Sequence, residues 1–347
     1  KMDTNIFKVN RIPSLTWNWL HMNDASVERV PQGTDTDVLQ DIQGNVESGE
    51  EDGFSITGIR TGMGDNVTTL VENSGIKIKK LRGFEMTEKE HNGIARLTFD
   101  FTEDSINGFE LVAEEQSDFT VIMNYNGPRD QEISACIQTR YQVKKGARLT
   151  LVQINKLGEN FSFMNDLGGI VEEGGTFQLI QLILGAKNNY YGNFTSLSGE
   201  KSHLISDMGY LLTEDSKLDI NTVADHTGKK TLSDINVYGV LRDNSEKTFR
   251  GTIDFHRGCS GAKGNELENV LLMDDDVINR TIPVILCDEE DVEGNHGASI
   301  GKIDEDLLFY MQSRGMDEKA IYEMIAKARV DSIINLIPDE ETKASLM

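Results

Sequence analysis

The sequence predicts an all-β core with small helical ends, and three observations support that prediction. From residue 54 to about residue 287, short runs alternate apolar and polar side chains with period two, as residues 119–125 do. Turn signals recur between residues 199 and 288, with strand-length segments between them. No helix of ordinary length fits there, so the crossover helices of a doubly wound fold are missing. A sandwich, a barrel and a solenoid remain open as architectures.

The N-terminal residues 1–53 are predicted to form a short helix followed by an acidic loop. Residues 12–22 show a short amphipathic pattern that carries Trp17 and Leu20. Residues 24–52 hold nine carboxylates against one arginine, and this composition favours an exposed, mobile loop. The β core is therefore expected to span residues 54–300.

A glycine-rich segment closes the core. Gly294, Gly297 and Gly301 punctuate residues 291–301, so turns or short extended pieces are expected there. His296 lies within this segment and is expected to be exposed. Cys287 lies nine residues before it, at the end of an apolar run.

Residues 301–347 are predicted to contain a pair of helices. Apolar residues recur at helical spacing from Ile303, and Asp304 is a suitable N-terminal cap. Gly315 suits the left-handed position that follows a helix. A second helix is expected to begin at Asp317 and to end by Pro338.

Composition and charge exclude several classes of function. With 58 acidic and 34 basic residues, the net charge of −24 argues against nucleic acid and anionic membranes as main partners. No apolar run is long enough to cross a bilayer. The first residues lack the pattern of a signal peptide, and three scattered cysteines, one of them Cys287, form no disulfide framework. A reducing cytoplasm is the expected compartment.

Several segments together resemble the SufB/SufD family, whose members build iron–sulfur clusters with the ATPase SufC. At the C-terminal end, the order of an HGA segment, ID-x-x-x-LFY-x-x-SRG and an amphipathic helix is similar to the family's signature. The clear resemblance covers residues 220–336, with a weaker one near the start. The matching segments are Asp225-His226, Thr231-Leu232-Ser233, Val237–Leu241, Phe249–Ile253, Leu271–Met273, Pro283–Ile285, His296–Gly315 and, more weakly, Ile12–Leu20.

The resemblance implies a right-handed parallel β-helix and a non-catalytic, SufD-like role. A SufB-type paralogue and a SufC-type ATPase are the implied partners, with a homodimer when the chain is alone. Iron or a transient iron–sulfur cluster is implied within the complex, and none is expected on the isolated chain. The last coils, around residues 271–286, are expected to carry the dimer contact.

His296 and Cys287 are the residues that the resemblance assigns to cluster assembly. SufD members place a functionally important histidine in the HGA segment, and imidazole binds iron. Cys287 matches a cysteine of many SufB sequences, and thiolate is a natural iron ligand. Glu268 stands where SufB-type members carry a cysteine, and Gly294 stands where SufD-type members often carry one before the histidine. A chain that lacks both thiols is poorly suited to act as a scaffold alone, and it resembles SufD more than SufB.

The C-terminal helices are the expected ATPase-binding element, because they are amphipathic, adjacent and terminal. The alternative interpretation is that their apolar face caps the open end of the solenoid. The residues expected to bind the partner are Leu307, Phe309, Tyr310, Arg314 and Gly315.

Other chemistry is less well supported. His256 and Cys259 would chelate a metal only if both faced one side, and a structural zinc site needs four ligands. Residues 274–276, three aspartates in a row, have the composition of a turn. The glycine-rich residues 58–64 are not expected to precede a helix, and no P-loop motif is present, so the chain is not itself the ATPase. A SufB-like scaffold acting alone and a β-helical carbohydrate-active enzyme remain as alternatives.

Overall fold

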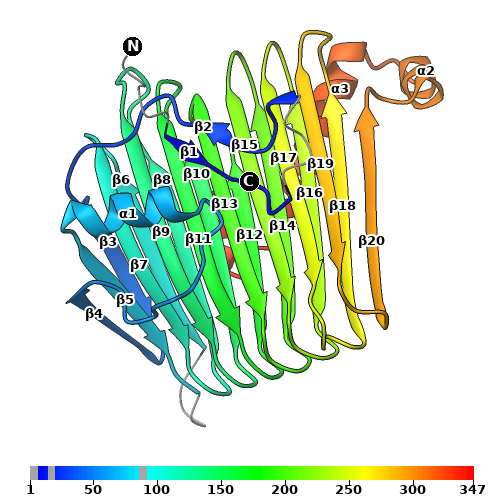
Figure 1. Cartoon of the computed structure of the whole chain (residues 1–347). Coiled ribbons are helices and arrows are strands. Elements are labelled where there is room, and N and C mark those ends of the chain that lie inside the picture. The colour runs from blue at the N-terminus through cyan, green and yellow to red at the C-terminus, as the bar shows by residue number, and fades with distance from the viewer. Residues whose placement is uncertain (1–6, 15–19, 86–91) are drawn as a thin grey trace, which may run out of the picture.

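The computed structural model describes residues 7–14, 20–85 and 92–347. Two nine-stranded sheets face each other and form a parallel β-solenoid, with helices only on its outside (Figure 1). Consecutive core strands alternate between the sheets, and each one pairs in parallel with the next strand of its own sheet. The predicted all-β solenoid is confirmed, and the sandwich and barrel alternatives are wrong.

The two sheets are named here sheet 1 and sheet 2. Sheet 1 contains, in spatial order, β4 (Val46–Asp52), β5 (Lys77–Gly83), β7 (Ser105–Ala113), β9 (Ser134–Val143), β11 (Ser162–Val171), β13 (Asn188–Leu197), β15 (Lys217–His226), β17 (Glu246–Phe255) and β19 (Ile278–Cys287). Sheet 2 contains β3 (Val38–Gln43), β6 (Gly93–Asp100), β8 (Asp118–Asn126), β10 (Arg148–Lys156), β12 (Thr176–Ile183), β14 (His203–Leu212), β16 (Leu232–Leu241), β18 (Ala262–Leu272) and β20 (Val292–Gly301).

The coils stack in register, so a position that faces the interior in one coil faces it in the next. Phe119, Leu149 and Phe177 pair across β8, β10 and β12, and all three are buried in the core. Alternate positions point outward because the side-chain period of a strand is two. Register therefore decides which distant residues become neighbours.

The acidic segment 24–52 differs from the expected loop. It contains β2 (Ala25–Ser26), which pairs with β1 (Lys8–Val9), and the strands β3 and β4, which pair antiparallel with β6 and β5. The first coil of a solenoid has free backbone edges, and these two strands cover them. Their carboxylates face solvent, as in the ion pair between Glu51 and Lys80 at 2.6 Å. Residues 15–19, with Trp17 of the expected short helix, lie outside the described residues.

A helix directly follows the glycine-rich residues 58–64, so the expectation that none would follow is wrong. Helix α1 (Asp65–Ser74) buries Val67 and Val71, which are four positions apart, on the outer face of sheet 1. The backbone N–H of Met63 donates to the buried Asp166 carboxylate at 2.8 Å. This loop amide thus binds the protein's own carboxylate.

The C-terminal helices are α2 (Glu305–Ser313), α3 (Glu318–Ile334) and α4 (Glu340–Ala344). Asp304 and Asp317 accept hydrogen bonds from the first backbone N–H groups of α2 and α3, as predicted. Gly315 has the predicted positive φ, 92°. Helix α4, beyond Pro338, was not anticipated.

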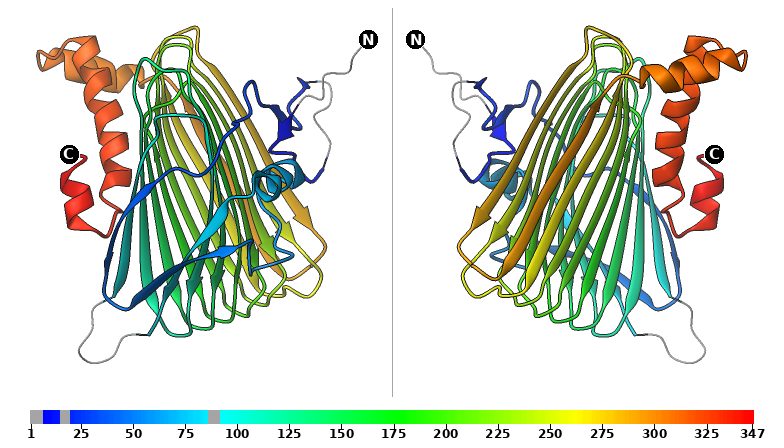
Figure 2. Two further views of the ribbon diagram at one scale, coloured as in Figure 1. Left: turned by 90° about the vertical axis from the view of Figure 1, so that its left-hand side faces the viewer. Right: turned by 90° about the vertical axis from the view of Figure 1, so that its right-hand side faces the viewer.

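Helix α3 packs along the outer face of sheet 2 and does not cap the open end of the solenoid (Figure 2). Ile333 and Ile334 are buried against apolar residues of β8, β10 and β12, such as Ile180. Helix α2 projects away from the body of the molecule. The alternative that the helices close the solenoid is therefore wrong.

Candidate functional site

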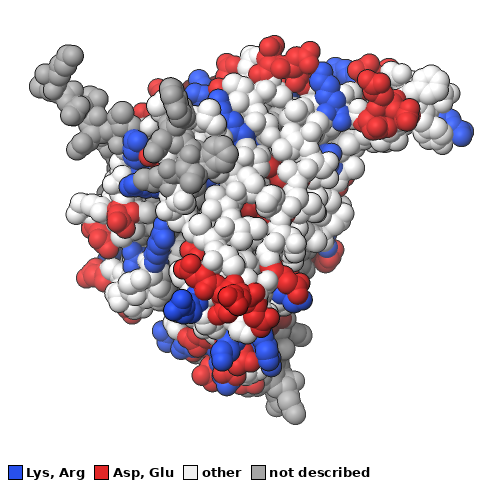
Figure 3. Space-filling view, turned by 45° about the vertical axis from the view of Figure 1, so that its right-hand side comes forward, with Lys and Arg blue, Asp and Glu red and all other residues white. Residues whose placement is uncertain are grey.

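The solenoid ends openly at β19 and β20. Each is the last strand of its sheet, with no further strand of the described chain paired to its outer edge. Side chains that would be interior in an earlier coil are uncovered here, and Ile285 and Ile300 are 37% and 40% exposed. Figure 3 turns the side of the molecule that carries β20 towards the viewer. The middle of this face carries few charged side chains, and acidic groups lie above and below it.

His296 lies on β20, so the expected glycine-rich turn is in fact a regular strand. Its partner in register is Glu266 on β18, which is buried. Since paired residues of parallel strands point to the same side, His296 faces the interior side of the coil. It is exposed only because no coil follows.

The position of Gly294 also faces the interior side. A Cβ atom there would lie 3.0 Å from the ring of Phe255 and 3.3 Å from Ile285. Positions 294 and 296 both face the interior side of β20, so a cysteine at the first and a histidine at the second would lie on the same surface. In this chain only His296 supplies a ligand atom there.

Cys287 ends β19 and pairs in register with Phe255, whose side chain packs against His226 inside the solenoid. The thiol of Cys287 is exposed, and its Sγ lies 3.0 Å from the backbone oxygen of Glu289, to which it donates. The other two cysteines, Cys136 and Cys259, are buried. Cys287 and His296 therefore lie at the same open end but on different sheets.

A buried ion pair lies in the coil beneath His296. Lys247 and Glu268, 0% and 1% exposed in their side chains, are joined by a short charge-assisted hydrogen bond. Thr281 donates to Glu268 at 2.6 Å and accepts from Lys247 at 3.0 Å. Burial lowers the pKa of Lys247, although Glu268 acts in the opposite direction. The sequence showed Glu268 only as a missing cysteine, because its partner lies 21 positions away.

Glu266 is the second buried acid of this coil. Burial, followed by the negative charge of Glu268, raises the pKa of Glu266 to about 7, while Lys247 acts to lower it. Its carboxylate packs over Gly251, where a Cβ atom would collide with it. A carboxyl group with this pKa exchanges a proton near neutral pH, and it occupies the position paired with His296.

Helix α2 presents the residues expected to bind an ATPase. None of its residues is buried, and Leu307, Phe309 and Tyr310 are 44%, 72% and 56% exposed. The guanidinium of Arg314 lies 5.3 Å from the ring centroid of Tyr310, where a cation–π contact holds it. The structure thus gathers the expected partner residues on one projecting element.

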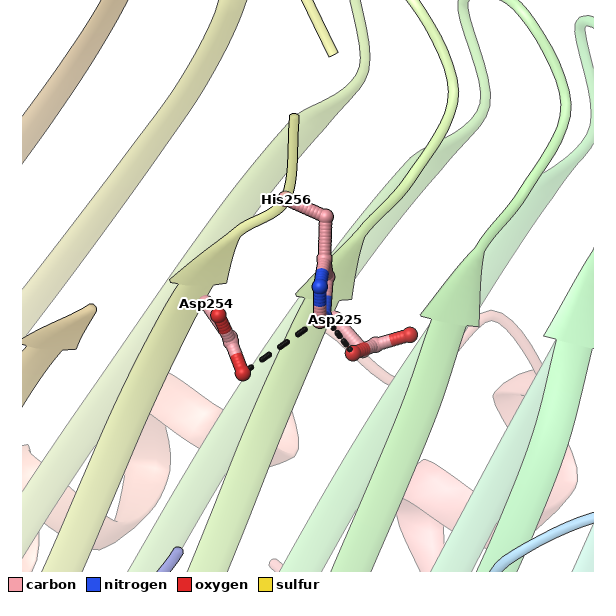
Figure 4. Close-up of side chains that lie close together, drawn as sticks. All are labelled: Asp225, Asp254 and His256. Carbon is pink, nitrogen blue, oxygen red and sulfur yellow. Dashed lines mark hydrogen bonds and ion pairs between the residues drawn. The ribbon is translucent and has the colours of Figure 1, made fainter. Parts of the chain in front are cut away.

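The spacing of His256 and Cys259 does not create a metal site. Cys259 is buried against Ile253, Phe255 and Ala262, whereas the ring of His256 turns to the opposite side, towards Asp225 (Figure 4).

The three consecutive aspartates, residues 274–276, form bends between β18 and β19, as their composition predicts. Among the described helices, none joins sufficient length to sufficient apolar character for a membrane span.

Comparisons with known proteins agree with this architecture. The sequence model of the family "SUF system FeS cluster assembly, SufBD core domain" matches residues 102–329. The iron–sulfur cluster assembly protein SufD of Bacillus subtilis is 24% identical over 68% of this chain and 55% of its own length. SufB of the same organism is 26% identical over 57% of this chain and 43% of its own length. A chloroplastic SufBD family protein of Arabidopsis thaliana is 35% identical over 35% of this chain and 22% of its own length. The chain thus spans about half the length of these two Bacillus relatives.

Proposed function

The chain belongs to the SufBD family of iron–sulfur cluster assembly proteins, and from this premise we propose that it is a SufD-like, non-catalytic subunit. Its partners in this proposal are a SufB-type paralogue and a SufC-type ATPase. Iron or a nascent cluster is the cargo of the complex and is held where the two paralogues meet. The alternative of a carbohydrate-active enzyme is set aside by the family membership.

The observation that carries the SufD-like role is the ligand set of the open end. It offers one imidazole, that of His296, and one exposed thiol, that of Cys287, on separate sheets. Protein-bound iron–sulfur clusters are usually held by four ligands, mostly thiolates. The carboxylate of Glu268 is buried in its ion pair with Lys247, so it supplies no ligand to this site. In this proposal, a partner subunit supplies the remaining ligands of the site.

The free edges of β19 and β20 are suited to contact with that partner. Unpaired backbone groups and the exposed side chains of Ile285 and Ile300 favour burial against a second β-solenoid. The paralogue would occupy this end in the complex, and a second copy of the chain would occupy it when the chain is alone.

Helix α2 is the proposed contact for the ATPase. Phe309 and Tyr310 are rigid aromatic side chains on an element with no buried residues, and such side chains are common binding hot spots.

The exposed thiol of Cys287 favours a second candidate function, a SufB-like scaffold that works without a paralogue.

Co-purification tests the proposal. The chain, co-expressed with a SufB-type paralogue and a SufC-type ATPase, is expected to bring both proteins along. A Phe309→Ala/Tyr310→Ala double variant should lose the ATPase and keep the paralogue. Leu39→Ala, which truncates a 70% exposed side chain on β3, is the matched control and should lose neither. Retention of the ATPase by the double variant would contradict the role of α2. Cluster formation by the chain and ATPase without the paralogue would favour the SufB-like function instead.

A further inference from the structure

We propose that Asp225, Asp254 and His256 form a binding site for a divalent transition-metal cation, away from the open end and independent of the function proposed above. These three residues make up the one group of at least three potential metal-ligating side chains found within the described residues. Their candidate ligand atoms all lie within 4.8 Å of one another. Figure 4 shows the imidazole reaching between the two carboxylates.

Strand register brings the two carboxylates together. Asp225 on β15 and Asp254 on β17 are paired residues, each one position before the end of its strand. The following residues, His226 and Phe255, are buried inside, so the two carboxylates point outward. Any coil pair with carboxylates in register stacks them in this way, because neighbouring strands are about 4.8 Å apart.

His256 supplies the third ligand from the turn after β17. Its backbone N–H donates to the oxygen of His226 at 3.0 Å, which fixes the turn to the neighbouring coil. Its Nε2 lies 2.7 Å from Asp225 and 3.5 Å from Asp254. Three ligands at about 2.1 Å from one cation lie about 3.0–3.4 Å apart, so small side-chain rotations close the site.

The carboxylates repel each other and are only partly hydrated. Their side chains are 17% and 21% exposed for Asp225 and Asp254. Burial is the main cause that raises the pKa of Asp254, and the charges of Asp225 and Asp288 add to it, whereas the charges of His256 and Arg60 lower it. Within the described residues, the carboxylate of Asp254 accepts no hydrogen bond, and its one ion pair is with His256. A bound cation would relieve this repulsion.

The ring of His256 lies between the two carboxylates, at the position that a shared cation would occupy. Burial lowers the pKa of His256, but its hydrogen bond to Asp225 and the charges of Asp254, Asp225 and Asp288 outweigh burial and raise it. In its neutral form the imidazole would bind the metal through the lone pair of Nε2.

Neighbouring residues support the ligands. Ser196 donates to the second oxygen of Asp225 at 3.2 Å and so holds that carboxylate in place. Asp288 follows β19 in the next coil, directly after Cys287, the partner of Phe255. Its backbone N–H donates to the oxygen of Phe255 at 2.8 Å, which places it beside His256. Its carboxylate or water would fill the remaining positions.

The donor set defines the class of metal. One imidazole with two carboxylates suits Zn²⁺, Fe²⁺, Co²⁺ or Mn²⁺, whereas Mg²⁺ and Ca²⁺ prefer oxygen ligands alone. The buried thiol of Cys259 takes no part, since it lies among Ile253, Phe255 and Ala262. A site without thiolates is suited to a mononuclear ion and not to an iron–sulfur cluster.

Metal titration of the tag-free chain, residues 1–347, tests the site. A Cys287→Ser/His296→Ala background removes the groups of the open end, and it should keep one Zn²⁺ site by isothermal titration calorimetry. Co²⁺ should give a visible absorption band in the same background. His256→Ala and Asp254→Asn are each expected to lower the Zn²⁺ affinity at least tenfold and to abolish the Co²⁺ band. Asp254→Asn preserves the shape of the side chain, so it also controls for misfolding.

The control is another histidine–aspartate pair with a single carboxylate. His203 lies 3.0 Å from Asp234 on adjacent strands of sheet 2, and His203→Ala should leave Zn²⁺ binding unchanged. The proposal is overturned if the background protein binds no Zn²⁺. It is also overturned if the His256→Ala and Asp254→Asn variants both bind Zn²⁺ with the affinity of the background protein.

Discussion

Glu266 and His296 occupy paired positions on β18 and β20, yet the first is 5% exposed and the second lies on the surface. The same register position is interior in one coil and uncovered in the next, because the solenoid stops at β20. An acid that is desolvated by its own coil thus lies beside an imidazole that is free to meet a partner.

Replacing His296 by alanine should impair cluster assembly and leave the fold intact. An exposed side chain contributes little to stability, so the free energy of unfolding should change by less than about 0.5 kcal/mol. Cluster absorbance in the reconstituted complex should fall severalfold. Asn295→Ala is the control, because Asn295 is adjacent on β20, faces the other side and bonds Asn265 at 3.1 Å. Full cluster yield from the His296 variant would contradict a role of this residue in cluster assembly.

The free energy of unfolding should depend on pH through Glu266 between pH 4.5 and about 7. Burial raises the pKa of Glu266 from 4.5 to about 7, so in this window the folded state holds a proton that the unfolded state has released. The contribution of this group to the free energy of unfolding therefore falls as the pH rises, by roughly 3 kcal/mol in total.

Glu266→Gln isolates that contribution. Asp166, whose pKa burial raises to about 6, shifts stability in the same direction, so the difference between variant and wild type is the quantity to measure. Urea denaturation should find the two proteins nearly equal at pH 5 and the variant more stable at pH 8. A difference that does not change with pH would contradict the raised pKa of Glu266.

Breaking the pair between Lys247 and Glu268 should be costly from either side. Lys247→Met or Glu268→Leu leaves one buried charge without its partner, and each is expected to lower the free energy of unfolding by about 3–5 kcal/mol. The double variant should lose much less than the sum, because neither member of the pair then stays buried without the other. The surface pair of Lys145 and Glu173, 54% and 60% exposed, is the control, and Lys145→Met should cost under about 1 kcal/mol. Additive losses at Lys247 and Glu268 would show that the two charges are not coupled.

Gly315→Val should loosen helix α2 without unfolding the solenoid. Gly315 has a φ of 92°, where a β-branched residue is strained by about 1–3 kcal/mol. Hydrogen exchange should show lower protection for residues 305–313, with the melting temperature nearly unchanged. Gly49→Val is the control, since Gly49 lies on β4 in open space and without positive φ. Equal protection of α2 in wild type and the Gly315 variant would contradict this account.

Local sequence patterns determined the features that depend on neighbours in the chain. The period-two runs predicted an all-β core. Asp304 and Gly315 predicted where α2 begins and ends, and Asp317 predicted where α3 begins. Each of these signals acts within about four residues, so no knowledge of the fold is needed. The resemblance in motifs then indicated the family and singled out His296.

Only the tertiary structure decided which residues lie together. Composition assigned residues 24–52 to a loop, and the glycines assigned residues 291–301 to turns or short extended pieces. Pairing with distant strands makes these segments the strands β3, β4 and β20. Asp225 meets Asp254, and Lys247 meets Glu268, because the length of each coil sets the register. That length is a sum over many residues and turns, which no local pattern encodes, so the charges at the open end and the proposed metal site emerge only when the coils stack.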